Sequence, residues 1–151
     1  MAWPNVSITR GDTAINYLKV VDSTGAAMDL AGVTILLTVK SIAPVASSTD
    51  LDDALAIIAH GIALDSAGVI ISSAGFALGG IDPVSLDPVS GATSGVVTHT
   101  VVPALSTTLV IGNYVYDVQV TDASGITKTI INGASWDVVA DIGRRTTVGV
   151  V

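Results

Sequence analysis

Apolar and polar side chains alternate along much of this chain, and the alternation is cleanest over residues 33–40, 113–121 and 134–141. Successive side chains of a β-strand point to opposite faces, so this alternation predicts strands with one buried and one wet face. Such half-buried strands are typical of antiparallel sheets. The predicted core face carries Val33, Ile35, Leu37, Val39, Tyr114, Tyr116, Val118, Val120, Ala134, Trp136, Val138 and Ala140.

Weaker strand patterns occupy residues 6–9, 13–21, 95–102 and 126–132, and the tail from residue 146. Turn signals separate these patterns at the spacing that sandwiches and barrels show. The sequence therefore predicts an all-β protein built from many short strands.

Two of the turns share one pattern, from Asp22 to Gly25 and from Asp122 to Gly125. In each, Asp stands at the first turn position, where its carboxylate can accept a backbone N–H, and Gly supplies a positive φ. We expect both turns to connect neighbouring strands tightly.

The middle of the chain, residues 41–94, has a different character. It contains TDLDDALAIIAHGIAL, in which Thr49 or Asp50 could cap a short helix, and the sequence DPVS twice, at 82–85 and 87–90. We interpret this segment as an elaboration with a short helix, short strands and an extended loop. The predicted architecture is a single β-sandwich domain over residues 1–151 with this irregular segment inserted.

Composition narrows the range of functions. All 13 acidic residues are Asp, only six residues are Lys or Arg, and the net charge is −7, which argues against binding to nucleic-acid phosphates. The chain has no cysteine, which excludes disulfides and thiolate chemistry. Half of the residues are apolar, so we expect part of the surface to be buried against partner subunits, in a homo-oligomer or multi-copy assembly.

Neither targeting nor membrane insertion is predicted. The start of the chain, MAWPNVSITR, has no basic region before an apolar run, so we expect no signal peptide. The longest uncharged stretch, residues 88–116, is interrupted by Pro103 and several glycines and does not fit a membrane span.

Few residues could support catalysis or bind a metal. His60 and His99 are the only imidazoles, both in apolar surroundings and without a catalytic motif, so we expect structural or surface roles and no enzyme activity. Asp50, Asp52 and Asp53 form an acidic cluster, but an EF-hand would need further ligands, a turn Gly and a terminal Glu. A helix start or a solvated loop is the better interpretation, and no catalytic, cofactor or metal site is predicted.

The aromatic residues raise a sugar-binding alternative. Trp3 and Tyr17 could contribute to such a surface, whereas Tyr114, Tyr116 and Trp136 fall on predicted core faces. A receptor- or glycan-binding module therefore remains open.

Two arginines follow the last clear strand pattern. Arg144 and Arg145 could form a salt bridge across a subunit interface or lie exposed on a tail, and the sequence favours neither arrangement.

Arg10, Gly11 and Asp12 spell RGD, a tripeptide known as a cell-adhesion signal. They lie between the strand patterns at 6–9 and 13–21, where Gly11 can adopt the φ of a corner and Asp12 can bond the following backbone. We interpret the tripeptide as the hinge of a first strand pair.

The opening ITRGDTAINYLKVVDSTGAAMDLAGVTILLTVKS resembles the amino-terminal β-sandwich domain of phage baseplate upper proteins and related tail or fibre proteins. Their pattern is a strand, an R-G-D/N-T-like corner, a long strand, a D-x-x-G turn and a "dL-x-G" step, here residues 29–32. The closing LVIGNYVYDVQVTDASGITKTIINGASWDVVADIGRR is similar to the endings of many phage structural proteins. Leu109 followed by Gly112-Asn113-Tyr114 also resembles the tyrosine corner of immunoglobulin-like sandwiches.

The resemblance covers about half of the chain and implies an immunoglobulin-like sandwich in a structural protein of a tailed-phage virion. Its expected place is the tail, baseplate, neck or a fibre attachment point, with other virion proteins as partners. A capsid-surface decoration protein is the alternative. Because a fold does not fix a function, both are expectations that follow from the resemblance.

Overall fold

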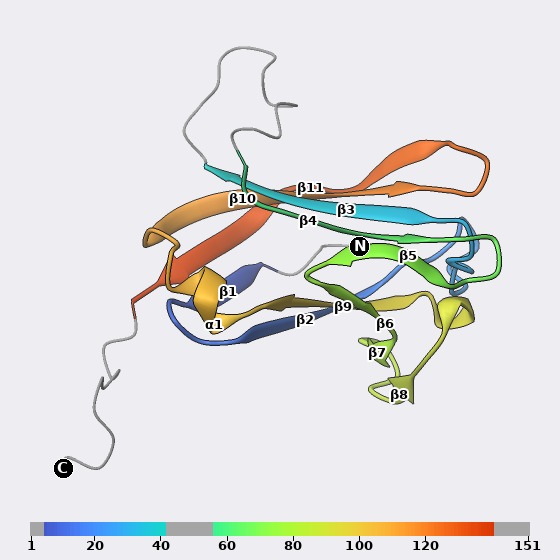
Figure 1. Ribbon diagram of the computed structural model, residues 1–151, viewed down its shortest axis with the longest axis horizontal. Coiled ribbons are helices and arrows are strands. Elements are labelled where there is room, and N and C mark those ends of the chain that lie inside the picture. The colour runs from blue at the N-terminus through green and yellow to red at the C-terminus, as the bar shows by residue number, and fades with distance from the viewer. Residues whose placement is uncertain (1–4, 42–55, 141–151) are drawn as a thin grey trace.

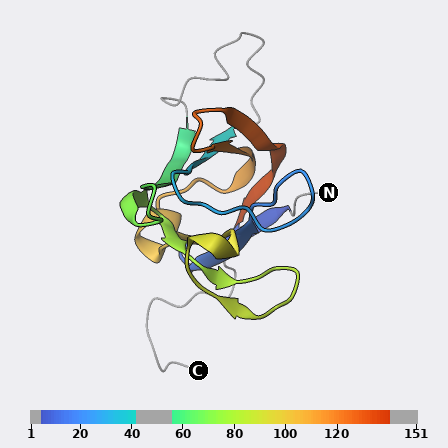
Figure 2. The ribbon, with the colours of Figure 1, turned by 90° about the vertical axis from the view of Figure 1, so that its right-hand side faces the viewer.

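The computed structural model describes residues 5–41 and 56–140, apart from the side chains of Ser41 and Asn132. Two β-sheets lie over one another (Figure 1), and the end view in Figure 2 shows how they curl around a shared interior. The larger sheet has the order β1-β11-β10-β3-β4-β5 and the smaller sheet the order β2-β9-β6. A two-stranded ribbon, β7-β8, stands beside the smaller sheet. The all-β prediction is confirmed.

The strands of the larger sheet are β1 (Val6–Thr9), β3 (Thr34–Ser41), β4 (Ala56–Leu64), β5 (Ile70–Ala74), β10 (Gly112–Thr121) and β11 (Thr127–Val139). The remaining strands are β2 (Ala14–Lys19), β6 (Phe76–Leu78), β7 (Gly80–Ile81), β8 (Pro88–Val89) and β9 (Val96–Val101). The helical elements of the described residues are a 3-10 turn, η3 (Ala92–Ser94), and a single turn of α-helix, α1 (Pro103–Ser106).

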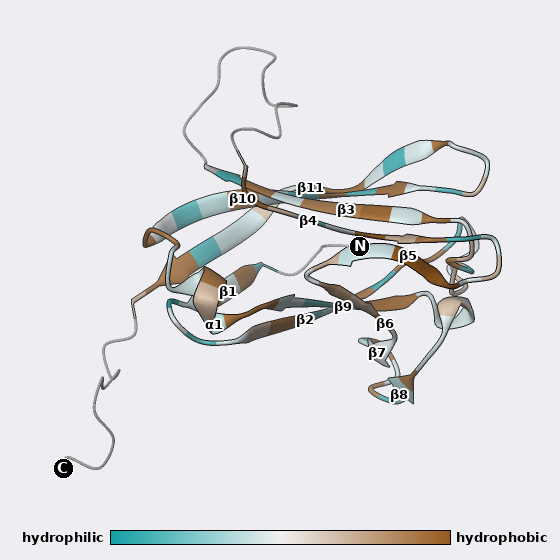
Figure 3. Ribbon diagram, in the orientation of Figure 1, coloured by the Kyte–Doolittle hydropathy of each residue, from teal (hydrophilic) through white to brown (hydrophobic). Residues whose placement is uncertain are grey.

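The predicted core faces of the two central strands are confirmed. Ile35, Leu37 and Val39 of β3 are buried, as are Tyr116 and Val118 of β10. The residues between them lie on the other face and are less buried, and Figure 3 shows bands of apolar and polar residues along β10 and β11. One part of the prediction is wrong, because Ala140 follows the end of β11 and is exposed.

The prediction of a short helix within residues 49–64 is wrong for residues 56–64, the part that the structure describes. Residues 56–64 form strand β4, which pairs with β3 on one side and β5 on the other. Ile58, Ile62 and Leu64 lie in the core at a spacing of two or four residues, and backbone pairing with two neighbours outweighs the local helix signal. The described part of the middle segment therefore contributes β4 and β5 to the larger sheet and β6 to the smaller sheet, and is not only an elaboration. Thr49 and Asp50 lie outside the described residues.

The last strands also differ from the expected division. Strand β11 runs without interruption over the two stretches predicted at 126–132 and 134–141. The pairing of β11 with β10 changes register on both sides of Val118, and this irregularity lets one long strand span both stretches. Strand β1 pairs in parallel with β11, whereas the other pairs of the larger sheet are antiparallel. The strand pattern from residue 146 lies outside the described residues.

Both predicted Asp-x-x-Gly turns are present, and a third turn, at Asp65, has the same hydrogen bonds. The turn at Asp122 connects paired strands as predicted, but the turn at Asp22 lies between β2 and β3, which belong to different sheets, so that part of the prediction is wrong. The Oδ1 atoms of Asp22, Asp65 and Asp122 each accept two backbone N–H groups of the following residues. The turn at Asp65 joins β4 to β5 and the turn at Asp122 joins β10 to β11. The connections β2–β3, β4–β5 and β10–β11 gather at one end of the sandwich (Figure 1).

Candidate interaction surface

The structure brings together the two histidines, which are 39 residues apart in the chain. His60 Nδ1 of β4 lies 2.8 Å from His99 Nε2 of β9, so the pair joins the two sheets by a hydrogen bond. His99 is fully buried against the rings of Phe76 and Trp136. Burial, followed by the nearby His60, lowers the pKa of His99 to about 3, and burial also lowers the pKa of His60. Both imidazoles are therefore neutral at neutral pH and serve to connect the sheets.

The interior around this pair contains further nitrogen atoms without a hydrogen-bond partner. These are Nδ2 of Asn16, Nδ1 of His99 and Nε1 of Trp136, all sealed from solvent. The three residues line a cavity of about 200 Å³ that opens between the two sheets. The three nitrogen atoms are buried, and the accessible wall of the cavity is mainly apolar.

The RGD tripeptide forms a corner, as predicted, but its two strands do not pair. Strand β1 belongs to the larger sheet and β2 to the smaller sheet, so the corner carries the chain from one layer to the other. Gly11 has a φ of 90°, and its N–H donates to Ser106 Oγ (3.0 Å). The same hydroxyl donates to the carbonyl of Asp12 (2.8 Å), and the Arg10 guanidinium donates to the carbonyl of Thr107 (3.1 Å). The predicted bond from the Asp12 carboxylate is absent from the described part of the chain.

The tyrosine-corner hydrogen bond is present. The Tyr114 hydroxyl donates to the carbonyl of Val110, four residues earlier, at 2.7 Å. Tyr116 and Trp136 are buried with their rings in an edge-to-face arrangement, 5.5 Å apart. The core interpretation of these three aromatic residues is confirmed, while Trp3 lies outside the described residues.

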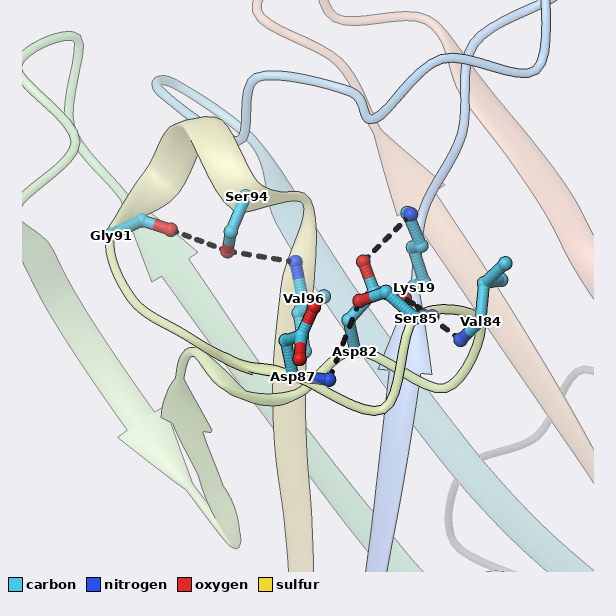
Figure 4. A network of polar contacts seen from close by, with 8 residues as sticks. All are labelled: Lys19, Asp82, Val84, Ser85, Asp87, Gly91, Ser94 and Val96. Atoms are coloured by element: carbon cyan, nitrogen blue, oxygen red, sulfur yellow. Dashed lines mark hydrogen bonds and ion pairs between the residues drawn. The ribbon is translucent and has the colours of Figure 1, made fainter.

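A tightly bonded loop, residues 82–87, connects β7 to β8 and includes the first DPVS sequence. Asp82 Oδ1 accepts the N–H groups of Val84 (2.8 Å) and Ser85 (3.3 Å), and the Asp82 carbonyl accepts the N–H of Leu86. Asp82 Oδ2 pairs with Lys19 Nζ of β2 at 2.8 Å, and Figure 4 shows this network. The hydrogen bond from Lys19, together with those from the loop, lowers the pKa of the Asp82 carboxyl.

This loop displays two large apolar side chains. Val84 is 72% exposed and Leu86 is 74% exposed, although the loop around them is held by several hydrogen bonds. Leu86 has a φ of 65°, and it is the one non-glycine residue with positive φ in the described ranges. A left-handed conformation is costly for a residue with a Cβ atom.

The loop adjoins strand β2, which also exposes apolar residues. Ile15 and Tyr17 of β2 and Pro83 of the loop line the same cavity of about 200 Å³. Ile15 is 53% exposed and Tyr17 is 38% exposed. We call the exposed residues that surround this cavity and continue onto the loop the apolar rim: Ile15, Tyr17, Pro83, Val84 and Leu86.

The repeated DPVS sequence predicts only a loop at this position. The available signal was Asp-Pro followed by isolated apolar residues between polar ones, a pattern that places apolar side chains on a turn. Its partner Lys19 is 63 residues away in the chain, and no local pattern indicates that contact.

The remaining candidates from the sequence can be followed only within the described residues. Within residues 5–41 and 56–140, no group of three His, Cys, Asp or Glu side chains could hold a metal ion. In the same ranges, no helix is long and apolar enough to cross a membrane. Asp52, Asp53, Arg144 and Arg145 lie outside the described residues, as does Asp50 of the same acidic cluster.

No protein-family model and no curated protein matches this chain.

Proposed function

We propose that this chain is an immunoglobulin-like sandwich that serves as a structural protein of a tailed-phage virion and acts by protein–protein assembly. The observation that carries the proposal is the apolar rim. Val84 and Leu86 project from a loop that hydrogen bonds and an ion pair hold in place, so their exposure is built into the fold. Exposed apolar groups on a rigid support are typical of contact surfaces between proteins.

The strand order supports the immunoglobulin-like part of the proposal. In a variable-type sandwich, two additional strands extend the sheet formed by the third, sixth and seventh principal strands. The run β11-β10-β3-β4-β5 beside β2-β9-β6 fits that arrangement, with β4 and β5 as the added strands. The hydrogen bond of Tyr114 at the start of β10 fits the tyrosine corner.

The position within the virion follows from the sequence resemblance alone. Tail, baseplate, neck and fibre attachment points are the proposed sites, and a capsid-surface decoration protein is the alternative. In each position the chain would be present in many copies and would contact neighbouring virion proteins through apolar surface.

A receptor- or glycan-binding module is favoured by one observation, the partly exposed ring of Tyr17 at the rim. Aromatic rings at a surface present an apolar face together with a polar tip. Loss of glycan binding in a Tyr17→Ala variant that still assembles would favour this second function.

The proposal is tested by quantitative mass spectrometry of gradient-purified particles from the phage that encodes the chain. We expect peptides of the chain in intact particles, in a constant ratio to the other virion proteins. A non-structural protein made during the same infection serves as the control for contamination. Absence of the chain from purified particles would overturn the proposal.

A further inference from the structure

Two edge strands, β1 and β2, border the cavity of about 200 Å³ between the sheets. Strand β1 ends the larger sheet and β2 ends the smaller sheet, and within the described chain each pairs with one neighbour. Val6 of β1 lines the cavity, as do Ile15 and Leu18 of β2. An apolar space of this kind leaves side chains without contacts on one side, which costs stability unless another group fills it.

The wall of the cavity suits an aromatic ring. Its accessible surface is mainly apolar, Tyr116 and Trp136 contribute their rings, and no Asp, Lys or Arg is among the described residues that line it. An apolar cavity of roughly 150 Å³ already admits a benzene molecule. A cavity of about 200 Å³ that opens between the sheets therefore accommodates a larger flat ring.

The chain directly before β1 carries such a ring. Residues 1–4, Met-Ala-Trp-Pro, contain no charged side chain, and Trp3 precedes Val6 by three residues. Three residues span at most about 11 Å. Because Val6 itself belongs to the wall of the cavity, the indole of Trp3 is within reach of the space that this wall encloses.

Pro4 lowers the entropic cost of placing the ring there. Its own φ is fixed, and the residue before a proline favours an extended conformation, so Trp3 has fewer conformations to lose. The short connection to Val6 also gives the ring an effective concentration in roughly the millimolar range. This concentration favours the ring of the same chain over one from a second copy.

We propose that the segment before β1 closes the cavity, with the indole of Trp3 seated between the two sheets of its own chain, against Leu18 and Leu37. Trp3 is then part of the core and completes the packing that the described strands leave open. The inference does not depend on the proposed virion function. It also removes Trp3 from the aromatic residues that could form an exposed sugar-binding surface.

The first test is NMR spectroscopy of the full chain with isotope-labelled methyl groups in Ile, Leu and Val. The Trp3 resonances are identified by their loss in Trp3→Phe. We expect nuclear Overhauser effects from the Trp3 indole to the methyl groups of Leu18 in β2 and Leu37 in β3, which belong to opposite sheets. The absence of both contacts would overturn the inference.

A mixed sample separates the chain's own Trp3 from that of a second copy. Methyl-labelled chains that carry deuterated tryptophan are combined with unlabelled chains, so that only contacts between two chains give a signal. We expect the contacts of Trp3 with Leu18 and Leu37 to disappear in this mixture. Contacts that persist would show that the ring comes from another copy and would overturn the assignment to the same chain.

The second test is the thermal unfolding of Trp3→Ala. We expect the unfolding temperature to fall by about 5 °C, because a large buried aromatic side chain is lost. Val110→Ala is the matched control, since Val110 is 72% exposed and does not line the cavity, and it should unfold like the wild type. A Trp3→Ala chain that unfolds at the same temperature as this control would contradict a buried Trp3.

Discussion

The hydroxyl of Ser106 fixes the corner that contains the RGD tripeptide. It is fully buried, accepts the Gly11 N–H and donates to the Asp12 carbonyl. The corner therefore depends on backbone groups of the tripeptide and not on the exposed carboxylate of Asp12. This makes Ser106, 95 residues from Gly11, the residue on which to test the interpretation.

We expect Ser106→Ala to lower the free energy of unfolding by about 2 kcal/mol, because two partly buried backbone groups, the Gly11 N–H and the Asp12 carbonyl, lose their partner. Urea-induced unfolding measures the change. Thr108→Ala is the control, since the Thr108 hydroxyl is exposed and bonds only the carbonyl of Leu105 within its own turn. Equal stabilities of Ser106→Ala and wild type would contradict the role of this hydroxyl.

His99 gives the fold a defined response to acid. Its pKa is lowered to about 3 in the folded chain, whereas an unfolded histidine titrates near 6.5. The unfolded chain therefore binds a proton first, and the stability that is present above pH 6.5 is lost as the pH falls towards 3. Between pH 6.5 and 5, before most carboxylates titrate, the stability lost through this histidine should rise from about half of 1.4 kcal/mol per pH unit towards about 1.4 kcal/mol per pH unit.

The measurement is urea-induced unfolding of wild type and His99→Leu at several pH values in this window. We expect the variant to show a shallower pH dependence, whatever its absolute stability. An unchanged slope would show that His99 is not the group responsible.

At the scale of elements, the loop between β7 and β8 owes its shape to a strand distant in the sequence. Lys19 of β2 compensates Asp82, whose other oxygen holds the N–H groups of Val84 and Ser85. In Lys19→Met the carboxylate loses its ion pair, and we expect faster amide hydrogen exchange at Val84 and Ser85.

The Asp65 turn provides an internal control for this experiment. Its carboxylate also binds two backbone N–H groups, at Ala67 and Val69, but has no contact with Lys19. Exchange at these two amides should not change. Unchanged exchange at Val84 as well would mean that the ion pair does not hold the loop.

Some of these elements can be predicted from the sequence, and others depend on contacts between residues that are far apart in the chain. Strands β3 and β10 were predicted correctly because one face is buried along their whole length, which imposes a period of two on the sequence. The segment that contains β4 allows a short helix, because Thr49 and Asp50 precede an alanine-rich stretch, and its observed strand depends on pairing with β3 and β5. The positive φ of Leu86 has no signal in DPVSLD, since the Lys19 contact that fixes the loop is non-local.

At the scale of the whole molecule, different parts of the sandwich have different roles. The Asp-x-x-Gly turns close one end, and the corner held by Ser106 carries the chain between the layers. The histidine pair connects the layers inside. The face formed by β2 and the β7–β8 loop combines large exposed apolar groups with an apolar cavity, and we propose it as the contact surface for assembly.

The most direct test of this account is a cryo-electron microscopy map of the intact particle. We expect many copies of the sandwich in the tail, the neck, the baseplate, a fibre attachment point or on the capsid, with Val84 and Leu86 buried against a neighbouring subunit. A map with no density for this chain, or one in which the apolar rim faces solvent in every copy, would contradict it.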